Sequence, residues 1–164
     1  MARTNFHKVV VGRAVMLTFT DPSIEDVPAK VDTGAYRSAV HADQIQVSPD
    51  GKTLSFRLLG GHPLYDSAAA VVTTDTFKKV TIENSFSQRE QRYEVRLRVK
   101  LGPKVFVAGF TLADRGKKTY PILLGRKLLN GRFLVDTAET SVDRLELKRR
   151  FGLKESLFDE EEGK

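Results

Sequence analysis

The chain has 164 residues, enough for one domain, and its 40% hydrophobic and 29% charged residues are typical of a folded globular protein, not of a disordered one. It contains no cysteine, which excludes a disulfide framework, a thiolate metal site and a cysteine nucleophile. The first residues are polar, and no run reaches the roughly 20 apolar residues of a membrane span. We therefore expect a cytoplasmic protein without a membrane partner.

Short apolar and β-branched segments, separated by turn residues, follow one another along most of the chain. Residues 48–52 are a strong turn signal that predicts a hairpin, and residues 83–90 predict the tip of a longer hairpin. Many short strands with closely spaced turns predict a mainly β fold in which the strands close into a barrel. The expected strands cover residues 8–18, 27–31, 45–47, 53–58, 68–74, 79–82, 92–101, 104–112 and 122–124.

Helical signals are few. Residues 125–130 predict one short helix that ends at Gly131. Residues 141–151 predict a terminal helix with Ser141 as its N-cap. The side chains expected to face inward from this helix are Val142, Leu145 and Phe151.

The formal net charge of +6 invites a nucleic-acid interpretation. However, charged and apolar residues alternate over residues 94–100, which is the pattern of a half-buried strand whose charges face water. We therefore favour a solvated strand face, and nucleic acid is not the expected partner. A basic RNA- or ribosome-binding protein is the alternative, and it predicts RNA affinity that falls steeply with salt.

The segment most informative about chemistry is Asp32-Thr33-Gly34, at the end of a short apolar strand. A carboxylate at a strand end, where the chain turns sharply, can point into a cleft. Gly34 lets two backbones approach without a Cβ between them, and Thr33 can hydrogen-bond to a partner copy. Two such carboxylates at close range share one proton, so that one acts as general base toward water and the other polarises the scissile carbonyl. The tripeptide alone is a weak signal.

A second element strengthens this interpretation. Residues 121–129 form an apolar run that ends in Gly125 and continues into a helix start. By itself this run predicts only a buried strand and helix. Aspartic peptidases, however, need such a strand behind the loop that carries the catalytic Asp. Together, residues 32–35 and 122–129 resemble the paired signature of retropepsins, the dimeric peptidases best known from retroviruses.

Further segments extend the resemblance to most of the chain, from about Val9 to Asp136. They are residues 11–13, 29–35, 38–42, 112–115, 120–126 and 131–136. Here the chain is similar to a bacterial branch of retropepsin-like aspartic peptidases that carries the label ATP-dependent zinc protease. The resemblance implies the acid protease fold. Some members of this branch are linked to a ribosomal-modification system, where they accompany a ligase that adds glutamates to a ribosomal protein.

The resemblance implies a peptidase domain over residues 1–140. Residues 141–164 would then be a C-terminal helix or tail, with its last residues, 159–164, disordered.

The zinc and ATP of the family label are not expected here. The sequence has neither a His-Glu-x-x-His motif nor a Gly-x-x-x-x-Gly-Lys phosphate loop, and its histidines, His7, His41 and His62, lack the spacing of metal ligands. We predict no cofactor. Although His41 lies close to the Asp32 turn, a hydrogen-bonded structural role is its simpler interpretation.

No second Asp-Thr-Gly is present, so the second carboxylate has to come from another copy. Dimerisation is therefore a predicted condition of activity. Asp136 precedes a threonine but lacks the glycine, and we interpret it as structural. The remaining candidates are interpreted as turn or surface residues: Asp43, Asp66 and Asp114.

The hairpin tip over residues 83–90 precedes the 122–126 element, as the flap of a retropepsin does. It lacks flap glycines, so an ordinary polar hairpin tip is an equally good interpretation. Arg37 and Arg126 are candidates for a preference for acidic substrates, with structural ion pairing as the alternative. The predicted substrate-binding residues are Tyr36, Arg37, Ser85, Phe86 and Arg126.

The sequence thus predicts an aspartic-type endopeptidase, active as a homodimer, with Asp32 as its catalytic residue. The residues that support the catalytic loop are Thr33, Gly34 and Ala35, and no metal ligand is predicted. An acidic or glutamate-extended protein is the substrate hypothesis. The alternative is a non-catalytic dimeric peptide-binding module of the same fold.

Overall fold

The computed structural model describes residues 8–151. Strands dominate it, which confirms the mainly β expectation. The elements, in chain order, are β1 (Val9–Val11), β2 (Ala14–Thr20), β3 (Ser23–Val31), β4 (Ser38–Val47), β5 (Leu54–Leu58), the 3₁₀ turn η1 (Asp66–Ala68), β6 (Ala70–Thr74), β7 (Phe77–Glu83), β8 (Arg89–Leu101), β9 (Lys104–Ala113), β10 (Ile122–Leu124), α1 (Arg126–Leu129), β11 (Phe133–Val135) and α2 (Arg144–Phe151).

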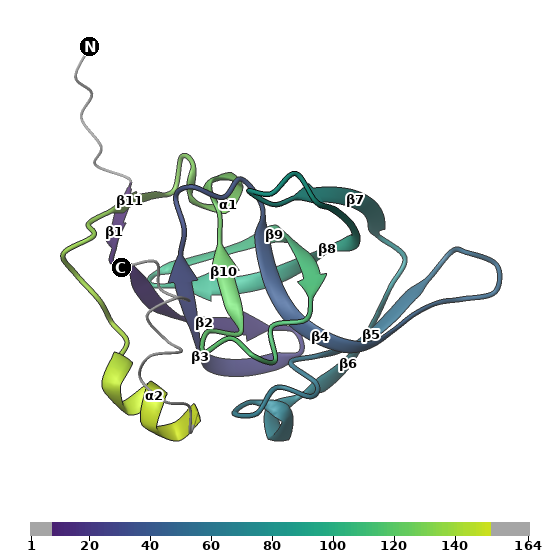
Figure 1. Cartoon of the computed structure of the whole chain (residues 1–164), viewed down its shortest axis with the longest axis horizontal. Helices are drawn as coiled ribbons and strands as arrows, with labels where there is room; N and C mark the ends of the chain where they lie inside the picture. Colours follow the sequence, from purple (N-terminus) through teal and green to yellow (C-terminus); the bar gives the residue numbers. More distant parts are fainter. Residues whose placement is uncertain (1–7, 152–164) are drawn as a thin grey trace, which may run out of the picture.

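Six strands pair in a closed ring. The order β10-β3-β2-β8-β9-β4 returns to β10, because β10 pairs with both β3 and β4 (Figure 1). Strands β5 and β6 continue from β4, and β7 pairs with β8 as the second arm of the long hairpin predicted from the sequence. Strands β1 and β11 form a separate parallel pair. The side chains inside the ring make up the main core, and its fully buried members include Leu17, Phe19, Val27, Phe110 and Ile122.

Strand β8 shows how the sequence pattern specifies the ring. Val95, Leu97 and Val99 are at most 4% exposed and point into the core, whereas Arg96 and Arg98 between them are exposed. Burial of each of these apolar side chains stabilises the fold by roughly 1.5–3 kcal/mol. The predicted alternation is therefore confirmed over most of its length. Its first residue, Glu94, departs from it, because this carboxylate is only 5% exposed instead of facing water.

Several strand boundaries differ from the predictions, and two of the differences have a clear physical reason. The single strand predicted over residues 8–18 is split into β1 and β2 at Gly12, where the backbone of Glu139 packs so closely that a Cβ would collide with it. Strand β4 begins at Ser38 and not at residue 45, because its first half is buried on both faces and shows no alternation in sequence. The hairpin predicted around residues 48–52 is confirmed by the pairing of β4 with β5.

The C-terminal helix starts later than predicted. Asp143, not Ser141, caps α2, since its Oδ1 accepts a hydrogen bond of 3.1 Å from the Glu146 N–H. Val142 is buried as expected, but Leu145 is 66% exposed, and Leu147 takes the inward place. The predictions for the Phe151 side chain and for the tail over residues 159–164 lie outside the part that the structure describes. Within residues 8–151, no helix is long and apolar enough to cross a membrane.

Candidate active site

Asp32 follows β3 directly, on a loop that is fixed by β10. Strand β10 lies between β3, to which it is parallel, and β4, to which it is antiparallel (Figure 1). The loop over residues 32–37 therefore crosses the end of β10 as the chain passes from β3 to β4. Because Ile122 and Leu124 of β10 are fully buried, the support beneath the loop belongs to the core of the molecule.

Backbone hydrogen bonds hold this loop along its whole length. The Asp32 N–H donates to the Leu124 carbonyl oxygen at 2.9 Å. The Ala35 carbonyl accepts from the Arg126 N–H at 2.8 Å, and the Tyr36 carbonyl accepts from the next N–H of α1 at 2.9 Å. With residues 32, 35 and 36 attached to β10 and α1, the loop has little freedom to move the Asp32 carboxylate.

Gly125, between β10 and α1, is required by a close approach of two backbones. A Cβ at this position would lie 2.5 Å from the Arg37 carbonyl oxygen and 2.7 Å from that of Tyr36. The Gly125 N–H donates to the Oγ of Ser38 at 3.0 Å, and Ser38 is 2% exposed. The glycine that ends the predicted strand therefore lets α1 pack directly under the loop that carries Asp32, which we call the Asp32 loop.

Gly125→Ala is expected to lower the free energy of unfolding by about 1–3 kcal/mol, because backbone atoms and not flexible side chains have to move. Urea unfolding would measure this. Gly116→Ala is the matched control, since the nearest atom to its Cβ would be Oδ1 of the exposed Asp114 at 3.2 Å. We expect the control to change stability by less than about 0.5 kcal/mol. Equal unfolding midpoints for the two variants would contradict the close-approach argument.

The Asp32 carboxylate itself is partly exposed. Its Oδ1 accepts a hydrogen bond from the Gly34 N–H at 3.0 Å, whereas Oδ2 accepts none within residues 8–151. Arg126 braces the same loop by donating from Nη1 to the Thr33 carbonyl oxygen at 3.0 Å. One carboxylate oxygen is thus oriented by the loop, and the other is available to a water molecule or to a group from another chain.

Tyr36 is 51% exposed and lies between two guanidinium groups, with the Cζ atoms of Arg37 and Arg126 at 6.0 and 5.8 Å from its ring centroid. An exposed aromatic ring flanked by cations offers a surface for a peptide with acidic groups. The structure therefore brings three of the predicted substrate-binding residues together beside Asp32.

A cleft separates the Asp32 loop from the β7–β8 hairpin. The loop contributes residues 34–37, and the hairpin contributes residues 81–83 and Arg92. Arg115 closes the cleft from the segment after β9. Three arginines, counting Arg37, and a single carboxylate, Glu83, line this cleft, although Arg37 is paired with Glu94 and Arg92 with Glu90. The lining side chains themselves carry more positive than negative charge, which favours an acidic ligand. Neither Arg92 nor Arg115 was among the predicted site residues.

Ser85 and Phe86, predicted to bind substrate, are at the hairpin tip, outside the set of residues that line the cleft. Phe86 is 82% exposed. The tip is closed by Asn84, whose Oδ1 accepts hydrogen bonds from the N–H groups of Phe86 and Gln88 at 2.9 and 3.0 Å. The tip is therefore an ordered turn, and a role for Ser85 and Phe86 in binding stays a prediction.

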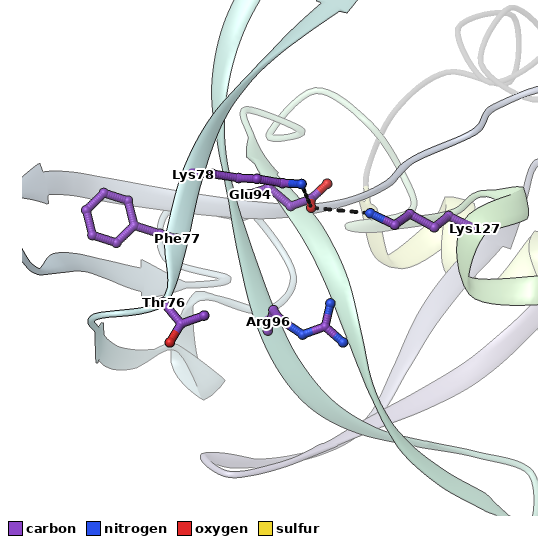
Figure 2. A pocket seen from close by; sticks show the side chains of 6 residues that line it. All are labelled: Thr76, Phe77, Lys78, Glu94, Arg96 and Lys127. Carbon is purple, nitrogen blue, oxygen red and sulfur yellow. Dashed lines mark ion pairs between the residues drawn. The ribbon is translucent and has the colours of Figure 1, made fainter.

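Glu94, on β8, connects the hairpin to the Asp32 loop through Arg37. Its sequence context did not predict this role. It accepts a hydrogen bond of 2.5 Å from Nη1 of Arg37, and the Nζ atoms of Lys78 and Lys127 both lie 3.6 Å from its Oε1 (Figure 2). Burial raises the pKa of Glu94, but the hydrogen bond from Arg37 and the charges of the three cations together outweigh it, so that the pKa lies below its ordinary value. Arg37 lines the cleft and is at the same time held in a structural ion pair.

A family model described as RimB-like, retropepsin-like aspartic endopeptidase RimB, matches residues 10–146. The chain belongs to this family. The match confirms the resemblance drawn from the residues around Asp32 and Gly125. It covers the ring of strands, the Asp32 loop, the hairpin and α1.

Relatives of this RimB-like chain include proteins that are much longer. It is 33% identical over 135 residues to a protein named probable alpha-L-glutamate ligase from Desulfotalea psychrophila, with 80% of the chain and 28% of that protein covered. A protein of the same name from Shewanella pealeana is 27% identical over 156 residues, with 90% and 33% covered. The chain therefore spans about a third or less of the length of these relatives.

Among solved structures, this member of the RimB-like family is similar to a protein with unknown function from Legionella pneumophila. The TM-score is 0.64 at 27% sequence identity, and the comparison covers 80% of this chain and 95% of the other.

His41 has the structural contacts that its sequence position suggested. It is 4% exposed, its Nε2 lies 2.7 Å from the Gly60 carbonyl oxygen, and its Nδ1 accepts from the Arg115 N–H at 2.8 Å. These partners fit the neutral ring protonated on Nε2. His41 thereby ties β4 to two loops, one of which carries the cleft residue Arg115.

The other carboxylates weighed from the sequence have local partners. Asp136 follows β11, and its Oδ1 accepts from the Ala138 N–H at 3.0 Å. Asp43 and Asp66 both bind Arg57, at 2.9 and 2.7 Å, and Asp114 is exposed in a turn. Within residues 8–151, no group of three or more His, Asp or Glu side chains is placed to hold a metal ion.

Proposed function

We propose that this RimB-like chain is an aspartic-type endopeptidase that works as a homodimer, with Asp32 of each subunit activating one water molecule. The observation that carries the proposal is the position of Asp32, on a loop anchored to β10 and α1 and beside a cleft. The chain has one Asp-Thr-Gly, so a pair of carboxylates needs two chains. Membership of a family of retropepsin-like aspartic endopeptidases supports the same chemistry.

In the proposed dimer, two Asp32 carboxylates share one proton, because two negative charges at such close range are unfavourable. The ionised carboxylate takes a proton from water as the water oxygen attacks the scissile carbonyl carbon, and the protonated carboxyl gives its proton to the carbonyl oxygen. The tetrahedral diol then collapses, the C–N bond breaks as the nitrogen takes up a proton, and a carboxyl and an amine are released. The enzyme forms no covalent intermediate.

We further propose an acidic peptide, or a protein extended with glutamates, as the substrate. The cleft is lined by Arg37, Arg92 and Arg115, which favours negative side chains. Relatives of this chain are named probable alpha-L-glutamate ligase and carry the matching region within a longer protein. A peptidase domain that shares a chain with a ligase for glutamate would have glutamate-linked peptides within reach.

A subunit-mixing experiment tests the need for two Asp32 residues. Wild-type protein is mixed with increasing amounts of Asp32→Asn protein, subunits are allowed to exchange, and cleavage of a fluorogenic glutamate-containing peptide is followed. Because only wild-type homodimers carry both carboxylates, activity per wild-type subunit should fall in proportion to the wild-type fraction. Mass-labelled subunits verify that exchange has taken place. If activity per wild-type subunit then stays constant, a site shared between two subunits is ruled out. Peptide binding without any cleavage by the wild type would instead favour the non-catalytic binding module.

A further inference from the structure

A second hollow, beside the cleft, has three basic residues among the six that line it. It lies where β7 and β8 face α1, and Figure 2 shows its side chains. Only the β7–β8 hairpin contributes to both hollows, and no residue lines both. The residues around this second hollow, which we call the cationic pocket, are Thr76, Phe77, Lys78, Glu94, Arg96 and Lys127.

Positive charge exceeds negative charge in the cationic pocket. Its single carboxylate, Glu94, is buried and already takes a hydrogen bond from Arg37, which is not a lining residue. The Nζ atoms of Lys78 and Lys127 lie 3.6 Å from Oε1 of Glu94, which is too far for a hydrogen bond. The two lysine side chains are 60% and 37% exposed. Both ammonium groups therefore keep donors for another anion.

Arg96 adds a third positive charge on the same strand as Glu94. It forms no ion pair within residues 8–151, and its one hydrogen bond there is a long contact of 3.5 Å to the Val107 carbonyl oxygen. In a hollow lined by three cations and one carboxylate, a further carboxylate lowers the electrostatic free energy, and the low-dielectric walls strengthen this attraction.

Strand β7 connects the cationic pocket to the cleft. Lys78 lines the pocket and Ile82 lines the cleft, four residues further along the strand, so these two positions are roughly 13 Å apart at about 3.3 Å per residue. On β8 the two linings come closer, at Glu94 and Arg92. An extended peptide has the same rise per residue. A peptide that lies along β7 in the cleft would therefore bring a side chain about four positions away to the cationic pocket.

We propose that the cationic pocket binds the carboxylate of an acidic side chain of the substrate, about four residues from the side chains that occupy the cleft. This inference rests on the proposed peptidase function and adds a second contact point, so that long acidic peptides are preferred over short ones. Each added contact to an exposed cation contributes a modest free energy, and two or three of them together give a preference of about three- to tenfold.

The test measures binding, not turnover, in the Asp32→Asn background, and compares labelled tetraglutamate and octaglutamate peptides by fluorescence anisotropy. Octaglutamate should bind about three- to tenfold more tightly per molecule, and Lys78→Gln with Arg96→Gln should remove most of this advantage. The matched control is Lys79→Gln with Arg98→Gln, which makes the same change in charge at exposed neighbours outside the pocket and should keep the advantage.

If the two double variants lost the octaglutamate advantage equally, the effect would come from long-range charge alone, and the proposal would be overturned. Equal affinity of the Asp32→Asn protein for tetraglutamate and octaglutamate would overturn it as well. Lys127→Gln is a second, independent variant on α1 with the same expected direction. Melting temperatures of all variants verify that the fold is intact. Because the test needs no cleavage, the two hypotheses can fail separately. If the pocket does not bind the substrate, the dependence of binding on peptide length is absent. If the peptidase assignment is wrong, the wild type does not cleave the peptide.

Discussion

Asp32→Asn is expected to lower kcat for peptide hydrolysis by at least about 10³-fold, because an amide cannot take a proton from the attacking water. The fold should persist. The carbonyl oxygen of Asn can still accept the hydrogen bond from the Gly34 N–H, and the contact of residue 32 with Leu124 is made by the backbone. The measurement is steady-state cleavage of a glutamate-containing peptide, with thermal unfolding and sedimentation of the same samples.

Asp136→Asn is the matched control. Asp136 also follows a strand, precedes a threonine and accepts a backbone N–H bond of 3.0 Å at Oδ1, so the chemical change is the same and the local backbone contact is similar, although Asp136 is more exposed. Its loop, however, is not part of the cleft. We expect activity within about twofold of the wild type. Comparable turnover by the Asp32 and Asp136 variants would remove Asp32 from the mechanism.

The Asp32 loop and its support were predictable because their backbone geometry restricts residue type. Gly125 has no room for a Cβ, and the strand before it is buried, so the glycine and the apolar run leave a pattern in the sequence. The same holds for Asp32 at its strand end. The closed pairing of strands followed from short segments with frequent turns, although the first half of β4, buried on both faces, gave no alternating pattern.

Glu94 was not predictable as a special residue. In sequence it is one of several charged residues that alternate with apolar ones on β8, and its neighbours Arg96 and Arg98 are exposed as that pattern indicates. Its burial comes from Arg37, 57 residues earlier, and from Lys127 on α1, which cover this end of the strand. Such burial depends on how the loop and helix pack, and no local sequence signal carries that information.

Substitutions at the Arg37–Glu94 pair are expected to lower stability unequally. Glu94→Gln leaves cations that are 29–60% exposed and can be rehydrated, so we expect a loss of about 1–3 kcal/mol in the free energy of unfolding. Arg37→Gln leaves a carboxylate that is 5% exposed without its hydrogen-bond donor, and we expect about 3–5 kcal/mol. The double variant should lose less than the sum of the two, because the residues act as a pair. Urea unfolding of the four proteins measures the cycle.

Acidity should remove the contribution of Glu94. Its pKa is lower in the folded chain than in the unfolded chain, so the stability it contributes is complete above its ordinary value of 4.5 and is lost as the pH falls through the lower folded value. The difference in unfolding free energy between wild type and Glu94→Gln should therefore shrink as the pH is lowered from 6 to about 3. Asp50 and Asp66 also have lowered pKa values, but the wild type and Glu94→Gln both contain them, so their effect cancels in this difference.

Glu90→Gln is the control, because Glu90 is exposed and is paired only with Arg92 within residues 8–151. It should lower the free energy of unfolding by less than about 0.5 kcal/mol at every pH. A Glu94 difference that does not shrink at all as the pH falls would mean that packing, and not the ionised carboxylate, links the hairpin to the Asp32 loop.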